Sequence, residues 1–390
     1  MRITIVTGFF LPVPPVRGGS TEKIWHRLAR EFAAAGHQVT FLSRSWPGFA
    51  ERETVDGVTH HRLPGADHTG SRWRNLWRDF RWGLRVTRAL PPGDAVICNT
   101  VLLPIWLRRC KPAAGRVVAV VARMPKGRGR AYGGVDLLLA LGEAVAERLR
   151  AENPRLAPRI ALFPYPIDWR LHAEARAASR RPPLPLTIGY VGRLHPEKGL
   201  HLLLAAARIL TERTDLPPWT LEIVGPVSVP AGGGGEAWWE ALRAEFAPAL
   251  GTRLRPSGPE FDPGKLAARY AGMDIFCYPS VAEHGETFGV AVAEAMAAGC
   301  APVVSDLACF RDLIREGETG LVFDHAGSDA PARLAANLAR LLGDPGLRRD
   351  LAARAQAHAR GFDYAACSRT VLDRLARLAA AGPSRELNPR

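Results

Sequence analysis

Short apolar runs alternate with helical patterns along the first part of the chain. Residues 2–10 form a strand-like run. The next segment carries apolar side chains at helical spacing, namely Ile24, Leu28, Phe32 and Ala35. Further strand-like runs follow at 38–43, 94–99, 116–122, 135–142 and 159–166. Strands separated by helices or loops in this order predict a parallel sheet covered on both faces.

A second series of the same kind follows. Residues 171–186 lose the apolar rhythm and end in prolines, so we predict the domain boundary there. The later strand-like runs lie at 186–194, 219–225, 266–280, 300–306 and 319–324, and a helical region covers 329–381. The pattern therefore predicts an α/β protein with two doubly wound parallel-sheet domains in tandem, whose ligands bind at the carboxyl ends of the strands.

Composition agrees with a two-domain globular protein. The 390 residues are 47% hydrophobic and 23% charged, which is enough for two domains that each bury a core. No apolar run approaches the roughly 18 to 20 residues that cross a bilayer, and the apolar start breaks at prolines, unlike a signal peptide. The six cysteines are widely spaced and are expected to be reduced thiols. We predict a cytoplasmic protein.

The net charge of +14 is confined to the first domain. Residues 1–170 carry 27 Lys and Arg against 13 Asp and Glu, whereas the remaining residues carry 25 of each. This asymmetry favours an anionic partner for the first domain, such as a membrane surface, a phosphorylated acceptor or nucleic acid. A loop with Arg123 and Lys126 contributes to this positive charge. Either the loop contacts the anionic partner, or it is an ordinary solvated surface loop.

A helix rich in arginine and tryptophan is predicted over residues 71–88. One face carries Trp73, Leu76, Trp77, Phe80 and Leu84, beside a stripe formed by Arg74, Arg78, Arg81, Arg85 and Arg88. Trp82 and Val86 fall on the far side. Three partners stay open for the aromatic face: the first sheet, an anionic bilayer at the inner face of the membrane, or nucleic acid.

Candidate chemistry lies in the second domain. Glu286 and Glu294 flank the start of a helix near Gly289, and eight helical residues span roughly 12 Å, which suits two parts of one elongated ligand. Alternatively, neither glutamate binds a ligand: Glu286 is an acid favoured by the helix dipole at the start of the helix, and Glu294 is a solvated helix residue. Arg193 and Lys198 bracket a turn after a strand, where two cations can hold a diphosphate. The alternative is a loop charge paired with Glu197.

Together these stretches resemble the retaining glycosyltransferases of sequence family 4. The resemblance rests on the two glutamates spaced E-x7-E, on "YPS" at 278–280 before them, on "EAMAAGCAPVVSD" after the first glutamate, and on "GRLHPEKG" at 192–199. It continues in the Gly18 and Gly19 loop and in the segments 36–39, 164–168, 221–226 and 317–323, so it covers nearly the whole chain.

The resemblance implies a GT-B fold, in which two Rossmann-like domains face each other and a helical segment ends the chain. It assigns residues 1–170 to acceptor binding and residues 171–365 to nucleotide-sugar binding. Residues 366–390 would form a helix that crosses back to the first domain. The donor-binding residues that it implies are Gly18, Gly19, Gly192, Arg193, Lys198, Gly225, Pro226, Glu286, Thr287, Phe288, Gly289, Val290 and Glu294.

The implied reaction moves a hexose-type sugar from a GDP- or UDP-sugar to a glycan or lipid-linked acceptor, as in polysaccharide biosynthesis. Arg193 and Lys198 would neutralise the donor diphosphate, so that no metal and no cofactor are expected. Glu286 would contact the sugar hydroxyls and Glu294 the ribose. Front-face substitution, with the leaving phosphate oxygen taking the acceptor proton, would retain the anomeric configuration. No nucleic-acid partner is expected.

One position departs from the family pattern. Many relatives carry a histidine where this chain has Asn99, and an asparagine cannot serve as a charged acid or base near neutral pH. Alternatives for the whole chain are a nucleotide-sugar epimerase on the same fold and, from another class, a basic protein that binds nucleic acid or membrane.

Overall fold

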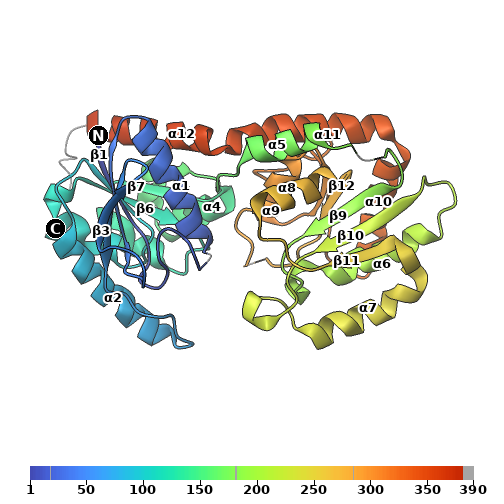
Figure 1. Ribbon diagram of the computed structural model, residues 1–390, viewed down its shortest axis with the longest axis horizontal. Coiled ribbons are helices and arrows are strands. Elements are labelled where there is room, and N and C mark those ends of the chain that lie inside the picture. The colour runs from blue at the N-terminus through green and yellow to red at the C-terminus, as the bar shows by residue number, and fades with distance from the viewer. Residues whose placement is uncertain (18, 181, 284, 381–390) are drawn as a thin grey trace. The chain divides into compact units, whose positions relative to one another are not determined.

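The computed structural model describes residues 1–380 apart from Gly18, Arg181 and His284. The chain folds into two compact units (Figure 1). Unit 1 comprises Met1–Pro166 together with the last helix, which begins at Tyr364, and unit 2 comprises Ile167–Asp363. Within the described part of the chain, no helix is both long and apolar enough to cross a membrane.

Unit 1 is built on a mainly parallel sheet of eight strands in its described residues, in the order β3-β4-β2-β1-β5-β6-β7-β8. Its strands are β1 (Arg2–Val6), β2 (Gln38–Arg44), β3 (Arg52–Val55), β4 (Val58–Leu63), β5 (Ala95–Cys98), β6 (Arg116–Val121), β7 (Leu137–Ala140) and β8 (Ile160–Leu162). Only β3 runs antiparallel, as the edge partner of β4. This hairpin was not predicted, whereas the other strands match the apolar runs of the sequence.

The helices of unit 1 cover this sheet. They are α1 (Ser20–Ala34), α2 (Arg72–Ala89), α3 (Leu103–Cys110), α4 (Glu143–Glu152) and α12 (Tyr364–Ala380). Ile24, Leu28 and Phe32 are buried, as the helical spacing predicts. Helix α12 packs against α1, where the guanidinium of Arg27 lies 5.1 Å from the ring centroid of Tyr364. The last helix therefore belongs to the unit in which the chain began.

Unit 2 is built on a second sheet, which is parallel and has six strands in the described residues, in the order β11-β10-β9-β12-β13-β14. The strands are β9 (Leu186–Val191), β10 (Trp219–Val224), β11 (Leu254–Ser257), β12 (Ile275–Tyr278), β13 (Ala301–Ser305) and β14 (Leu321–Phe323). The order reverses at β9, which lies between β10 and β12. In doubly wound sheets such a switch point opens a crevice at the carboxyl ends of the strands.

The helices of unit 2 are α5 (Trp169–Ala178), α6 (Leu200–Thr211), α7 (Glu236–Leu250), α8 (Pro263–Ala271), α9 (Val290–Ala297), α10 (Ala330–Gly343) and α11 (Pro345–Ala359). Helix α5 occupies part of the segment 171–186, where the loss of apolar rhythm predicted a domain boundary but no helix. Asp168 caps this helix, and Arg176 donates to the carbonyl oxygens of Ala271 and Met273, each at 2.9 Å. Polar anchors rather than an apolar stripe hold it, so the hydrophobic pattern did not predict it.

Both ends of unit 2 meet at one short pairing. The backbone N–H of Ile167 donates to the carbonyl of Phe362 at 2.8 Å, and Ile167 forms an isolated parallel bridge with Asp363. The chain thus enters and leaves unit 2 at neighbouring residues.

Helix α2 packs on unit 1 through the side that carries Trp82 and Val86, and not through most of the aromatic face that includes Trp73 and Trp77. Trp82 and Val86 are buried, and the indole N–H of Trp82 donates to the Thr7 carbonyl at 3.0 Å. A Cβ on Gly83 would lie 2.5 Å from the Trp106 ring, so glycine allows this side of the helix to pack closely. Trp73 and Trp77 are instead 83% and 60% exposed.

The buried His60 on β4 makes the stability of unit 1 depend on pH. Its ring is 1% exposed, stacks on Phe41 with centroids 5.8 Å apart, and has no hydrogen-bond partner among the described residues. Burial, aided by the nearby charge of Arg62, lowers its pKa from 6.5 to about 4. The folded state therefore holds His60 neutral at pH values where the unfolded chain protonates it.

We expect the wild type to lose stability relative to His60→Phe as pH falls from about 6.5 towards 4. The loss approaches about 3 kcal/mol, because each pKa unit is worth about 1.4 kcal/mol. Urea unfolding of both proteins across this range measures the difference. The exposed His68 supplies the control variant, His68→Phe, which should follow the wild type. Parallel curves for wild type and His60→Phe would contradict the assignment.

Candidate functional site

The ends of three neighbouring strands of unit 2 meet through close backbone contacts. A Cβ on Gly225, after β10, would lie 1.8 Å from the carbonyl oxygen of Gly192, after β9. A Cβ on Gly199, at the start of α6, would lie 1.9 Å from the carbonyl oxygen of Pro279, after β12. Only glycine fits at either position, and both also have positive φ. The predicted residues Gly192 and Gly225 therefore do lie together.

The turn after β9 is fastened to the turn after β10. The N–H of Leu194 donates to the carbonyl of Pro226 at 3.0 Å, and the Tyr190 hydroxyl donates to the carbonyl of Arg193 at 2.9 Å. These bonds fix the backbone from which Arg193 and Lys198 project.

Lys198 and Glu286 form a nearly buried ion pair. Nζ of Lys198 lies 2.5 Å from Oε2 of Glu286, and the two side chains are only 6% and 13% exposed. The hydroxyl oxygen of Ser280 lies 3.2 Å from the same carboxylate oxygen, and the ammonium lies 5.5 Å from the centroid of the Tyr278 ring. The sequence analysis selected both charged residues but did not foresee that they pair with each other.

Arg193 has a different environment. Its guanidinium contacts Oε1 of Glu197 at 2.8 Å and donates to the Gly232 carbonyl at 2.7 Å, and its side chain is partly exposed. The alternative of a loop charge paired with Glu197 is therefore correct for Arg193 in this structure. It is wrong for Lys198, whose partner is Glu286.

The two glutamates do not share one helix. Helix α9 begins at Val290, so Glu286 and Thr287 lie in the preceding loop, and the helical span of roughly 12 Å does not apply. Gly289 has a left-handed conformation with φ of 80°, and a Cβ there would lie 2.7 Å from the Phe310 ring. Phe288 is buried beside it.

Glu294 is not a solvated helix residue. Its Oε2 accepts a hydrogen bond from the Tyr270 hydroxyl at 3.1 Å, and its side chain is half-buried. Burial, followed by the charge of Glu294, raises the pKa of Tyr270 well above its usual value, so this hydroxyl remains a donor.

Sequence reasoning missed the aromatic and hydroxyl groups around the ion pair. Tyr190 and Tyr278 stack with centroids 5.6 Å apart, and burial followed by the Glu286 charge raises the pKa of both phenols. Ser280 is fully buried, and its carbonyl accepts a hydrogen bond from Ser305 at 2.5 Å. The available signal was the position of these residues at or just after strand ends.

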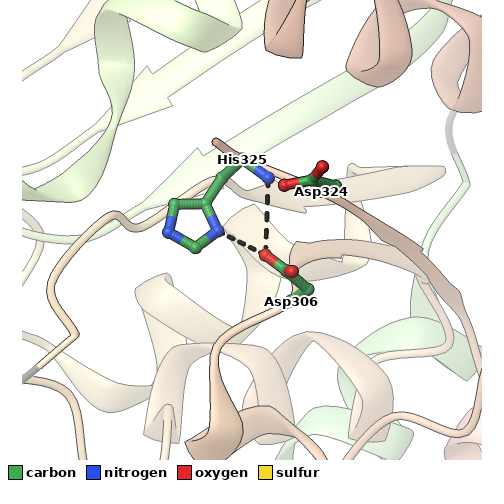
Figure 2. A group of neighbouring side chains, drawn as sticks. All are labelled: Asp306, Asp324 and His325. Atoms are coloured by element: carbon green, nitrogen blue, oxygen red, sulfur yellow. Dashed lines mark hydrogen bonds and ion pairs between the residues drawn. The ribbon is translucent and has the colours of Figure 1, made fainter. Parts of the chain in front are cut away.

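A second polar cluster lies at the same edge of the sheet, after β13 and β14. Figure 2 shows Asp306 between the backbone N–H and the ring of His325, with Asp324 beside them. Partial burial raises the pKa of Asp306, but the hydrogen bonds from His325 outweigh it, so the pKa lies below its usual value. Arg333 lies 3.2 Å from Asp324 and already supplies a cation there. These contacts are sufficient to explain the cluster as a set of bonds that hold the loop before α10 in place.

Other predicted site residues belong to unit 1. Asn99 follows β5, and neither its side-chain oxygen nor its nitrogen has a hydrogen-bond partner among the described residues. Gly19 precedes α1 with φ of 98°, whereas Gly18 lies outside the described residues. Arg123 and Lys126 are exposed.

Known proteins are similar to this chain in sequence and in fold. Residues 172–358, most of unit 2, match the family described as glycosyl transferases group 1. A phosphatidyl-myo-inositol mannosyltransferase from Mycobacterium leprae is 28% identical over 95% of this chain and 96% of its own length. Further relatives match over about half of their own length.

Solved structures extend the likeness across both units. Sucrose-phosphate synthase from Thermosynechococcus elongatus has a TM-score of 0.76 at 20% identity, covering 98% of this chain and all of its own. HepE from Anabaena, solved with UDP-glucose, has a TM-score of 0.67 at 17% identity, covering 97% and 100%. Two parallel-sheet units with these neighbours define a GT-B fold. The match of residues 172–358 to glycosyl transferases group 1 and the similarity to the mannosyltransferase over nearly its whole length both support the resemblance to sequence family 4.

The buried ion pair predicts a measurable coupling. We expect Lys198→Met to lower the free energy of unfolding by about 3 kcal/mol, because it leaves the Glu286 carboxylate with little solvent and without its cation. The double variant Lys198→Met/Glu286→Gln should recover part of this loss. A double-mutant cycle by urea unfolding measures it.

The exposed pair Arg213 and Asp215 serves as the comparison, and its removal should change stability little. If the changes in the free energy of unfolding were equal and additive at both pairs, burial would not be what couples Lys198 to Glu286.

Proposed function

We propose that the chain is a retaining hexosyltransferase that uses a GDP- or UDP-sugar and needs no metal ion. The observation that carries this proposal is the pairing of Lys198 with Glu286 at the meeting point of β9, β10 and β12, beside Arg193. The mannosyltransferase relative and the UDP-glucose complex of HepE support a nucleotide-sugar donor.

Lys198 supplies positive charge for the donor diphosphate. Glu286 fixes the position of the Lys198 ammonium, since Oε2 and Nζ are 2.5 Å apart and both side chains are nearly buried. A charge held in advance stabilises a leaving diphosphate more than a flexible one, and low local dielectric strengthens the effect. Arg193 adds a planar guanidinium, which binds phosphate oxygens in a bidentate manner once it turns from Glu197.

Glu286 also has capacity for the sugar. Lys198 and Ser280 both approach its Oε2, and among the described residues no hydrogen bond reaches Oε1. A carboxylate oxygen in this state accepts hydrogen bonds from hydroxyls. In the proposed complex Oε1 binds a hydroxyl of the transferred sugar, and the backbone near Phe288 and Gly289 assists.

Glu294 binds the ribose in this proposal. Tyr270 orients its carboxylate through a bond at 3.1 Å, and a carboxylate accepts from both hydroxyls of a ribose ring. The glycines at 192 and 225 let the backbone approach the donor closely, because neither carries a Cβ.

Retention follows from front-face substitution, in which the acceptor attacks on the side that the diphosphate leaves. The acceptor hydroxyl forms the new C–O bond, the bond from the anomeric carbon to phosphate oxygen breaks, and that oxygen takes the acceptor proton. No protein nucleophile is needed. Asn99 contributes at most a hydrogen bond, because its amide does not titrate. The acceptor in this proposal is a glycan or a lipid-linked acceptor, and the phosphatidyl-myo-inositol in the name of the relative supports the lipid-linked class.

Donor binding and turnover can be tested with a panel of GDP- and UDP-sugars. One nucleotide class should raise the melting temperature, and its nucleotide sugar should be hydrolysed slowly by water into the free sugar and the nucleoside diphosphate. Glu286→Ala should lower kcat at least about 100-fold, as expected when a group that stabilises the transition state is removed. Glu283→Ala, an exposed glutamate of the same loop, is the matched control. If no nucleotide or nucleotide sugar stabilises the protein, the proposal fails.

Metal independence has its own test. We expect the rate to be unchanged by EDTA and by the variant Asp306→Asn/His325→Ala, since Arg193 and Lys198 supply the positive charge. Loss of activity on chelation, restored by Mg²⁺ or Mn²⁺ in the wild type but not in this variant, would instead assign a catalytic metal to the cluster of Figure 2.

A further inference from the structure

Helix α2 carries an exposed apolar stripe along its outer side. We define the α2 stripe as Trp73, Trp77, Phe80 and Leu84, which are 83%, 60%, 36% and 37% exposed. Trp77 and Phe80 stack with centroids 5.7 Å apart, and Phe80 meets Trp106 of α3 edge to face at 5.6 Å. Scattered exposed apolar residues are ordinary, but a continuous aromatic stripe marks a surface that contacts something else.

The stripe is not needed to hold α2 in place. The opposite side of the helix already buries Trp82 and Val86, and Trp82 is bonded to the end of β1 through the Thr7 carbonyl. The helix (labelled α2 in Figure 1) therefore has a complete core-facing side and a second apolar side that contacts α3 only through Phe80 and leaves Trp73 and Trp77 largely exposed.

Arginines flank the stripe, and the structure divides them into two groups. Arg78 and Arg85 donate to the carbonyls of Asp67 and Pro64 and so fasten the helix to the preceding loop. Arg74, Arg81 and Arg88 are exposed, and no carboxylate among the described residues pairs with them. The one acid of the helix, Asp79, is buried and accepts from the Leu102 N–H at 2.9 Å. The outer side of α2 is therefore purely apolar and cationic.

We propose that the outer side of α2 docks on an anionic lipid surface. Aromatic side chains beside unpaired arginines fit the boundary between acyl chains and phosphate headgroups, where each group finds its preferred environment. The positive excess of residues 1–170 supports this choice, because it attracts unit 1 towards negative headgroups over a longer range. The phosphates of a nucleic acid would pair with the arginines, but the tryptophans of the α2 stripe would find no apolar environment there.

Vesicle co-sedimentation tests the proposal with the full-length protein. The protein should bind vesicles of phosphatidylcholine mixed with phosphatidylglycerol and not vesicles of phosphatidylcholine alone. Arg74→Gln/Arg81→Gln/Arg88→Gln should weaken partitioning about 100-fold, because each basic residue near an anionic surface contributes roughly fivefold. Thermal melting verifies that each variant is folded, as expected for substitutions of exposed side chains.

The matched control removes the same charge elsewhere. Arg255→Gln/Arg349→Gln/Arg369→Gln alters three exposed arginines that do not belong to α2 and that form no ion pair among the described residues. It should partition like the wild type. An equal loss in both triple variants would show that only net charge matters and would overturn the docking surface.

Insertion of the stripe has a separate readout. Lipids with brominated acyl chains should quench tryptophan fluorescence in the wild type, and Trp73→Ser/Trp77→Ser should lose most of this quenching. Unchanged quenching would overturn the proposal, as would tighter binding to duplex DNA than to anionic vesicles, or stripe variants that change only the oligomeric state. None of these measurements uses transferase activity, so their failure leaves the proposed reaction untouched, and failure of the donor panel leaves the docking surface untouched.

Discussion

The contact between Lys198 and Glu286 is the constraint around which unit 2 is arranged. Two opposite charges lie 2.5 Å apart with little solvent, and such a pair is tolerated only if its geometry is held from several sides. Residues from three strand ends do this: Gly199 abuts the loop after β12, Ser280 reaches the carboxylate, and Ser305 secures Ser280. The same rigidity places a fixed charge at the switch point of the sheet.

Unit 1 solves a different electrostatic problem. It carries the whole positive excess of the chain, and cations at its surface repel one another unless paired or well solvated. Some of its arginines are paired inside the fold; Arg62, for example, is fully buried and bonds the carbonyls of Val13 and Ala50. Others, on α2, face solvent without acids. The division between structural and surface cations follows from geometry and is invisible in the net charge.

Much of the fold was predictable because buried parallel strands appear as continuous apolar runs. The β3–β4 hairpin was missed because its strands are short and largely polar. Helix α5 was missed because polar anchors hold it, and the orientation of α2 stayed open in the sequence because both of its sides carry tryptophan. At the site, motifs selected Lys198 and Glu286, but their pairing spans 88 positions and needs the folded sheet to be seen.

The short pairing of Ile167 with Phe362 and Asp363 has a bearing on how such chains diversify. Since unit 2 begins and ends at one bridge, it is an insertion with adjacent ends, and unit 1 is the discontinuous host that α12 completes. Recombination at two joints beside each other would replace the entire sheet of unit 2 while leaving the α1–α12 packing intact. In such an architecture unit 2 can be exchanged as a whole, while the fold and the surface of unit 1 stay unchanged.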